Sequence, residues 1–145
     1  MRIILPLFLF ISLTMSVLIG KTPQQSQLTI EFYGLRNSKG QICVLLYNSP
    51  KGYYKDKKAA YKSLLVPIKN QKATCIIPNL PEGDYAVVAI HDENFNQEMN
   101  TNLVGMPSEG VAVSNNAVSW WTPKDFSIAK INLNTNKSIS LKMNY

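Results

Sequence analysis

Residues 91–102, HDENFNQEMNTN, carry most of the side chains in this sequence that could do chemistry. They include the only histidine, His91, followed directly by Asp92 and by a run of acids and asparagines. Asp92, Asn94 and Asn96 alternate along the chain, so their side chains could point toward one centre, as the oxygen ligands of calcium do. Three interpretations follow: a metal site, a catalytic site, or a polar turn.

A calcium site here would use the carboxylate and amide side chains of the loop. The candidate ligands are Asp92, Asn94, Asn96, Glu98 and Asn100. Calcium needs about six to eight oxygens, several of them charged, and the last position of a complete loop would be Leu103, which cannot ligate. The sequence therefore predicts weak calcium binding at most, and no other cofactor. The alternative is that these residues accept hydrogen bonds from their own loop backbone.

A catalytic role for His91 would require a partner that orients it. A Ser-His-Asp set can be written with Ser114 and Asp92, but neighbouring residues on a strand point to opposite faces, which prevents Asp92 from orienting His91. A tight zinc or copper site is disfavoured, because there is no second histidine and no well-placed cysteine. We expect a protein that is not an enzyme. The alternative is a small hydrolase or metal-dependent enzyme that uses His91, Asp92 and Glu109.

A second unusual stretch, GMPSEGVAVSNNAVSWWTP (105–123), contains two adjacent tryptophans. An exposed tryptophan beside asparagine and glutamate side chains could stack on a sugar ring or on an apolar residue of a partner. The alternative is a loop that tryptophan clamps onto the core. The candidate ligand-binding residues of both stretches are His91, Asp92, Asn94, Asn96, Glu109, Asn115, Asn116, Trp120 and Trp121.

The elements that would position these residues are strands, because apolar and polar residues alternate with a period of two. The predicted strands are 27–35, 41–48, 63–70, 71–80, 84–92, 126–134 and 137–145. The first two and the last two are expected to form hairpins. A short helix of a turn or two is predicted around residues 56–63, and residues 92–125 form one long irregular loop. The fold class is therefore all-β, a seven-stranded antiparallel β-sandwich of the immunoglobulin or transthyretin kind.

The first twenty residues differ from the rest of the chain. Arg2 is followed by an apolar run that ends at Gly20, as in a secretory signal peptide. We expect residues 1–20 to be removed, residues 21–26 to be a flexible leader, and residues 27–145 to be the β-sandwich domain. The mature protein would then have no integral membrane span. It would be exported, either periplasmic or extracellular.

The net charge of +6 is unevenly distributed along the chain. Residues 21–72 contain ten Lys or Arg and two acids, whereas residues 73–123 contain six acids and no Lys or Arg. This separation and the expected export argue against a nucleic-acid partner. The partner is expected to be an unidentified envelope protein or a glycan. The Lys- and Tyr-rich segment 51–62 is either a second binding surface or a solvated loop covering one end of the sandwich.

Two cysteines, Cys43 and Cys75, could form a disulfide in an oxidising compartment. Side-chain alternation places Cys43 on the outward face of its strand and Cys75 on the inward face. Cysteines on opposite faces of a sheet cannot approach closely enough to bond, so the pattern argues against a disulfide.

Three segments together resemble the DUF2141 family of small exported bacterial proteins. They are LTIEFYGLRNSKGQICVLLYNSPKG, LPEGDYAVVAIHDEN and TNLVGMPSEGVAVSNNA. The family pattern after the histidine is similar to HDxNxNGxxDTNxxGxPxEG, whose core looks like a calcium loop. Here Gln97 stands at the glycine position and Asn100 at that of the second aspartate. The resemblance implies a transthyretin- or immunoglobulin-like β-sandwich and no established activity. We therefore expect a non-catalytic binding or structural module of the bacterial envelope.

Overall fold

The computed structural model describes residues 24–120 and 122–145. The expected signal peptide, most of the expected leader and Trp121 lie outside the described residues. The first strand begins at Gln25, so it includes the last two residues of the expected leader. No helix in these two described ranges has the length and apolar composition needed to cross a membrane.

The described chain is mostly β and contains ten strands, where the sequence predicted seven. The strands are β1 (Gln25–Tyr33), β2 (Gln41–Tyr47), β3 (Lys62–Pro67), β4 (Ala73–Pro81), β5 (Gly83–Asp92), β6 (Gly110–Val113), β7 (Val118–Ser119), β8 (Thr122–Pro123), β9 (Ile131–Leu133) and β10 (Lys137–Lys142). The short helices are η1 (Lys57–Ala59), η2 (Ser114–Asn116) and α1 (Phe126–Ala129). The three additional strands, β6 to β8, all come from the segment that was expected to be irregular.

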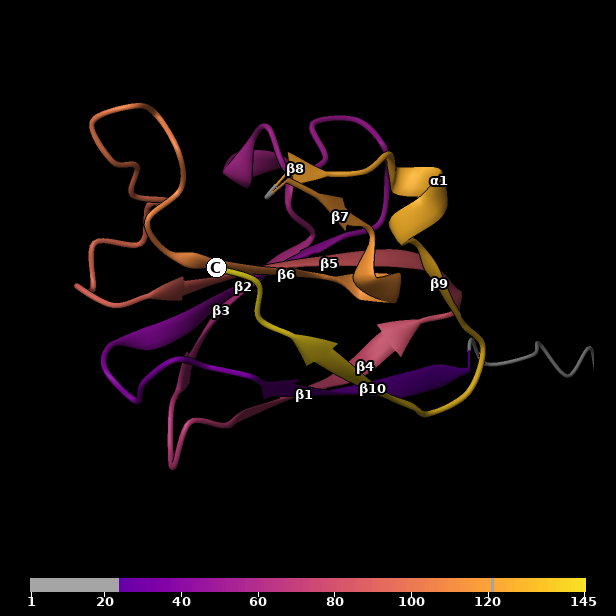
Figure 1. Ribbon diagram of the computed structural model, residues 1–145. Helices are drawn as coiled ribbons and strands as arrows, with labels where there is room; N and C mark the ends of the chain where they lie inside the picture. The colour runs from indigo at the N-terminus through magenta and orange to yellow at the C-terminus, as the bar shows by residue number, and fades with distance from the viewer. Residues whose placement is uncertain (1–23, 121) are drawn as a thin grey trace, which may run out of the picture.

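The strands form two main sheets and a small ribbon (Figure 1). One sheet has the order β10-β1-β4. The other has the order β3-β2-β5-β6, with β9 pairing beside β5, while β7 and β8 form the ribbon. Every pairing is antiparallel except that of β1 with β10.

Both expected hairpins were wrong, because each pair of consecutive strands is divided between the two sheets. The residues between β1 and β2 cross from one sheet to the other. Gly40 at their end has a φ of +72° and packs directly against the backbone of Asp92. The residues between β9 and β10 cross in the same way, so β10 lies beside β1 at the other end of the sequence.

The core lies between the two sheets and follows the predicted alternation. Leu28, Ile30 and Phe32 of β1 point into it, and Ile42 and Val44 of β2 meet them from the other sheet. Burying such apolar side chains is the main source of stability for a fold of this size.

The five-stranded sheet is buried on its outer face as well. Figure 1 shows η1, the β7–β8 ribbon and α1 lying over this sheet, on the side away from β1, β4 and β10. Leu45, Tyr47 and Val88 pack against this cover, whose own apolar residues include Tyr53 and Ala129. This double burial explains why β2 and β5 are almost continuously apolar.

The two cysteines lie on opposite faces of their strands, as the alternation predicted. Cys43 is on the covered outer face of β2, and Cys75 packs in the core between the sheets. Both are free thiols. Burial raises the pKa of Cys75, and burial together with the neighbouring carboxylate of Asp92 raises the pKa of Cys43 to about 12.

Two local predictions also differ from the structure. The helix expected around 56–63 is only the three-residue η1, because the chain pairs with β2 as strand β3 from Lys62 onward. The strand expected at 126–134 is divided into α1 and β9. Ala59 and Ala129 of these segments pack on the outer face of the five-stranded sheet, whereas β9 pairs with β5 within it, so tertiary contacts override the local pattern there.

Candidate functional site

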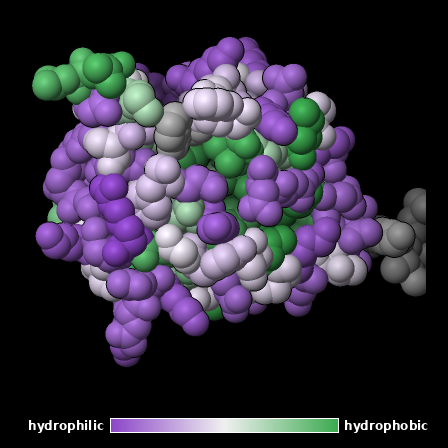
Figure 2. All heavy atoms as spheres, viewed as in Figure 1, coloured by the Kyte–Doolittle hydropathy of each residue, from purple (hydrophilic) through white to green (hydrophobic). Residues whose placement is uncertain are grey.

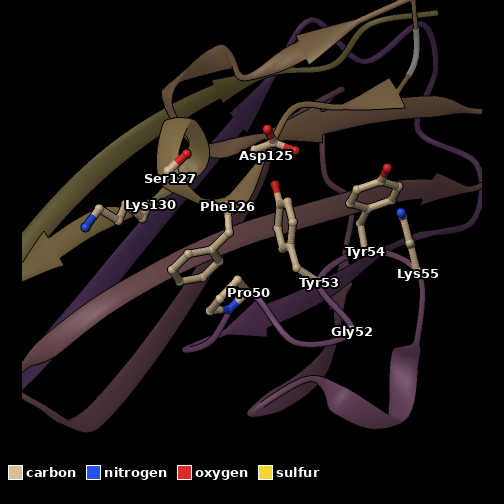
Figure 3. A pocket seen from close by; sticks show the side chains of 9 residues that line it. All are labelled: Pro50, Gly52, Tyr53, Tyr54, Lys55, Asp125, Phe126, Ser127 and Lys130. Atoms are coloured by element: carbon tan, nitrogen blue, oxygen red, sulfur yellow. The ribbon is translucent and has the colours of Figure 1, made fainter.

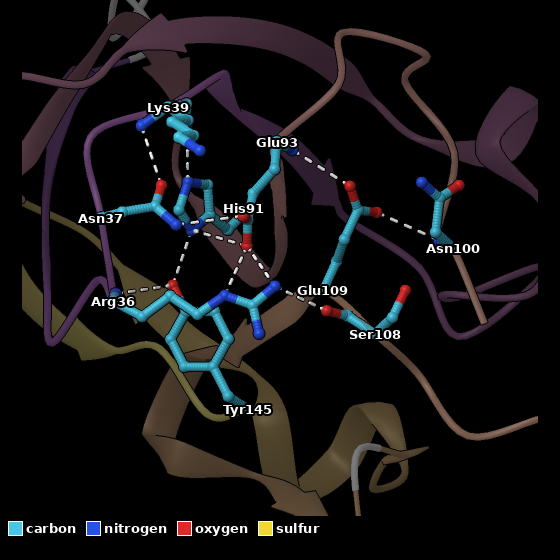
Figure 4. Close-up of polar contacts among 9 residues, drawn as sticks. All are labelled: Arg36, Asn37, Lys39, His91, Glu93, Asn100, Ser108, Glu109 and Tyr145. Atoms are coloured by element: carbon cyan, nitrogen blue, oxygen red, sulfur yellow. Dashed lines mark hydrogen bonds and ion pairs between the residues drawn. The ribbon is translucent and has the colours of Figure 1, made fainter. Parts of the chain in front are cut away.

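The polar stretch 91–102 includes the end of β5 and most of the loop between β5 and β6. Because His91 pairs with Gly110 across these antiparallel strands, the two ends of loop 93–109 lie side by side. The loop extends from one end of the five-stranded sheet (Figure 1). The side chains at its base come from four separate parts of the sequence (Figure 4).

His91 is completely buried and both of its ring nitrogens have partners. Nε2 lies 2.8 Å from the carbonyl oxygen of Lys39, and Nδ1 lies 2.6 Å from the Tyr145 hydroxyl. A carbonyl can only accept, so Nε2 donates to Lys39, while Nδ1 is paired with the Tyr145 hydroxyl. Burial raises the pKa of Tyr145, which keeps its hydroxyl protonated. Both ring nitrogens are therefore bonded to groups of the fold itself.

Asp92 is completely buried and its carboxylate organises the start of the loop. Oδ1 accepts a hydrogen bond from the backbone N–H of Asn96, and Oδ2 accepts from that of Gln97, each at 3.0 Å. Oδ2 also accepts from the Gln41 side chain at 2.9 Å and from the Cys43 thiol at 3.6 Å. Burial opposes ionisation, but these donors outweigh it and lower the pKa of Asp92.

Glu109 closes the loop from its other end. It is almost fully buried, and its two carboxylate oxygens accept from the backbone N–H groups of Glu93 and Asn100, each at 3.0 Å. The carboxylate therefore fastens the beginning and the middle of the loop to the start of β6.

Glu93 fixes the same loop to the crossing between β1 and β2. It accepts from Arg36 Nε at 2.6 Å and from Asn37 Nδ2 at 3.0 Å. Arg36 also donates to the Ser108 carbonyl at 2.8 Å and lies 4.8 Å from the centre of the Tyr145 ring. Burial opposes ionisation, but Asn37 and Arg36 lower the pKa of Glu93.

The candidate calcium ligands do not converge on an ion. Asn94 Oδ1 accepts from Asn96 N at 3.2 Å, and Asn96 Oδ1 accepts from Glu98 N at 2.9 Å. The oxygen of Asn100 accepts from the Asn96 amide at 2.7 Å. The first two bonds form Asx turns and the third joins two side chains, so all three oxygens already accept from N–H donors. Across 24–120 and 122–145, no group of three or more His, Cys, Asp or Glu could hold a metal.

The Ser-His-Asp set is not assembled either. Ser114 is buried, accepts from the backbone N–H of Val87 at 2.9 Å and donates to the Ala129 carbonyl at 2.6 Å. Val87 lies four residues from His91 on β5, or about 13 Å at the rise of a strand. Ser114 therefore joins β5 to the end of α1 and does not reach the histidine.

The nine candidate ligand-binding residues fall into three groups. His91, Asp92 and Glu109 are buried, and their side chains are bonded to the loop or to the residues that hold its base. Asn94 and Asn96 are exposed but shape their own turns.

The remaining candidates come from the second stretch. Asn115 donates to the carbonyls of Ile128 and Lys130, which fixes the end of α1. Asn116 is exposed, and Trp120 is 85% exposed. Trp121 lies outside the described residues.

The most exposed apolar feature is the tip of loop 93–109, which the sequence reasoning missed. Leu103 is fully exposed and Val104 is 77% exposed. Asn102 Oδ1 accepts from the backbone N–H groups of Val104 and Met106, each at 3.0 Å, so the tip is a defined turn. Figure 2 shows an apolar projection at the upper left, where Figure 1 places this loop. The available signal was an Asx residue followed by two apolar residues and a glycine.

The profile described as "Uncharacterized protein conserved in bacteria (DUF2141)" matches residues 30–140, so the chain belongs to this family. A comparison with curated proteins finds no match. Among solved structures, the chain has a weak likeness to a pilus-presented adhesin, with a TM-score of 0.28 and 16% identity. That likeness covers 84% of this chain and 27% of the adhesin chain.

Proposed function

We propose that this protein is an exported, non-catalytic binding module of the bacterial envelope. Its scaffold is an immunoglobulin- or transthyretin-like β-sandwich, and loop 93–109 presents the recognition surface. The partner is another envelope protein with an apolar recess. Two sheets that enclose one core, joined by chain crossings at their edges, support this scaffold.

One observation carries the proposal: the loop is rigidly held at its base, yet it exposes apolar side chains at its tip. The carboxylates of Asp92, Glu93 and Glu109 fix the base, and Asn102 fixes the turn. An exposed apolar tip is unfavourable in water unless a partner covers it. Pre-organisation lowers the entropy lost on binding, so a small rigid tip can act as an anchor.

The arrangement of the polar residues supports a non-catalytic role. The side chains of His91, Asp92, Glu109 and Ser114 each bond to backbone groups or to a tyrosine. Ser114 bonds to Val87, which lies about 13 Å along β5 from His91. A nucleophile would need to lie within hydrogen-bond reach of its base. A hydrolase and a calcium protein are therefore less well supported than a binding module.

Export is supported by the basic and apolar start of the sequence and is tested separately. The full chain, expressed in a bacterium with a periplasm, should be recovered from the periplasmic or culture fraction. Mass spectrometry should show an N-terminus close to Gly20. An intact N-terminus in the cytosolic fraction would contradict export.

Binding through the loop is tested with a Leu103→Ser, Val104→Ser double variant. The matched control is Ile76→Ser, which alters a 55% exposed apolar residue on β4, in the other sheet. Cross-linking in an envelope fraction should give a specific adduct with the wild type and the control and lose it with the double variant. Equal capture by all three proteins would refute the loop as the recognition surface.

A further inference from the structure

A second feature lies on the cover of the five-stranded sheet, away from the apolar tip. Residues 50–55 and the start of α1 enclose a hollow of about 630 Å³, open on one side (Figure 3). This volume is within the range of small-molecule sites and fits a ligand of disaccharide size. The hollow includes part of the Lys- and Tyr-rich segment that the loop-based function leaves unexplained.

Aromatic rings form the wall of this hollow. Tyr53 makes edge-to-face contacts with Tyr54 at 5.3 Å and with Phe126 at 5.6 Å between ring centres. Figure 3 shows the Tyr53 ring standing between the other two, with its hydroxyl toward Asp125. Rings held by such contacts keep a fixed orientation, as a stacking platform requires.

The Tyr53 hydroxyl is the decisive group in this hollow. The Tyr53 side chain is 4% exposed, and its oxygen has no hydrogen-bond partner within the described protein. In the part of the chain that the structure describes, the Ser26 hydroxyl is the other such buried group, and it lies on β1. Leaving a buried hydroxyl unpaired is costly, so its retention beside a hollow indicates a partner from outside the chain.

The other polar side chains that line the hollow determine which charge a ligand can carry. Asp125 precedes α1 but its side chain forms no capping bond, so its carboxylate is available to accept. Lys130 is paired with Asp84 at 2.7 Å, so its charge is compensated. Lys55 lies 5.6 Å from the centre of the Tyr54 ring. The positive charge of Lys55 and the negative charge of Asp125 cancel, so the lining has no net charge, which favours an uncharged ligand.

We propose that this hollow binds a neutral saccharide, with a sugar ring against the aromatic wall and its hydroxyls bonded to Tyr53 and Asp125. A sugar ring has an apolar face that stacks on aromatic side chains and hydroxyls that both donate and accept. Burial raises the pKa of Tyr53, which keeps its hydroxyl protonated as a donor. The site is independent of loop 93–109, so its failure would leave the proposed function unaffected.

The test uses two-dimensional amide NMR on the mature protein, titrated with cellobiose, maltose and N,N′-diacetylchitobiose in the millimolar range. At least one of them should shift the amides of Gly52, Tyr54 and Ser127. Tyr53→Phe should weaken this binding about five- to tenfold, the usual effect of one hydrogen bond. Asp125→Asn should weaken it as well, and Tyr33→Phe, an exposed tyrosine of β1, should not.

The melting temperature of Tyr53→Phe shows whether the Tyr53 hydroxyl serves a ligand or the fold. Because Tyr53→Phe removes an unpaired buried group, it should raise the melting temperature by about 2–4 °C while it weakens sugar binding. A lower melting temperature would mean that the hydroxyl has a structural partner and would overturn the proposal. No shift at these amides with any of the three sugars, or equal affinity in Tyr53→Phe, would also overturn it. Tighter binding of glucuronic acid would refute a neutral ligand.

Discussion

Asp92→Asn should destabilise the protein strongly, although the two side chains have nearly the same shape. Asparagine keeps one oxygen and replaces the other with an NH₂ donor. The groups around the Asp92 carboxylate are all donors: the N–H groups of Asn96 and Gln97, the Gln41 amide and the Cys43 thiol. In either orientation, the new amide nitrogen faces a backbone N–H, which then loses its carboxylate acceptor.

The magnitude follows from the burial of this carboxylate. A hydrogen bond to a charged group contributes about 1.5–3 kcal/mol, and a buried N–H without an acceptor costs a similar amount. We therefore expect the free energy of unfolding to fall by about 2–4 kcal/mol at neutral pH. For a chain of this size that corresponds to a melting temperature lower by roughly 8–15 °C.

The effect should also depend on pH in a defined direction. The folded-state pKa of Asp92 is lowered, so its stabilising contribution is complete above the unfolded-state value of about 3.9. The contribution is lost as the pH falls through the lower pKa of the folded protein. The difference between wild type and Asp92→Asn should therefore narrow as the pH is lowered from about 5 to about 2.

Thermal unfolding followed by circular dichroism across this pH range measures both effects. Asp125→Asn is the matched control, because Asp125 is exposed and makes no capping bond, so its melting temperature should remain close to wild type. If Asp92→Asn melts within about 2 °C of wild type at neutral pH, the carboxylate does not hold the loop. If the difference in melting temperature between the two proteins does not change with pH, the charge of Asp92 is not what stabilises the folded protein.

Three further predictions concern the same loop and the glycine that packs against its base. Gln97→Gly should raise the melting temperature by about 2 °C, because Gln97 has a φ of +59° that glycine adopts without strain, and a decrease would refute this. Gly40→Ala should lower the denaturation midpoint far more than Gly105→Ala, because a Cβ at position 40 would overlap the Asp92 backbone and one at position 105 would meet nothing. Equal effects of the two substitutions would contradict this packing. Millimolar calcium should leave the melting temperature unchanged relative to chelator, because the loop oxygens already accept from N–H groups; an increase would restore the calcium interpretation.

Side-chain alternation predicted which residues point inward, but it could not predict which strands pair. Leu28, Ile30 and Phe32 face the core as their spacing indicates. The same spacing is compatible with a hairpin or with a crossing to the opposite sheet, because both bury the same face. The pairing of β1 with β10 joins the two ends of the domain, and local sequence does not encode such a contact.

Strand β6, one of three that the sequence did not predict, shows a second limit. β6 has only four residues, all of them buried, in a segment rich in glycine, proline and asparagine. A short apolar run of this kind has no periodicity that separates strand from loop. It becomes a strand because Val111 and Val113 lie beside β5 and under the cover, which supplies the burial.

The polar loop was partly predictable for a clear physical reason. Asx turns are local, so the preference of Asn94 and Asn96 for their own backbone could be inferred from spacing alone. The partners of His91 could not, because Lys39 and Tyr145 lie 52 and 54 residues away. Such long-range partners come from the pairing of distant segments, which local spacing does not reveal.

Binding free energy comes from groups that a protein leaves unpaired, because a group that is already bonded must break that bond to contact a ligand. His91 and Asp92 are the residues whose types first suggested chemistry, but their polar atoms are bonded within the fold. Tyr53 is chemically ordinary, yet its buried hydroxyl has no partner in the described protein, and Leu103 is apolar and fully exposed. Each of these two side chains has more to gain from a ligand or partner than the histidine does, which is why both proposals rest on them.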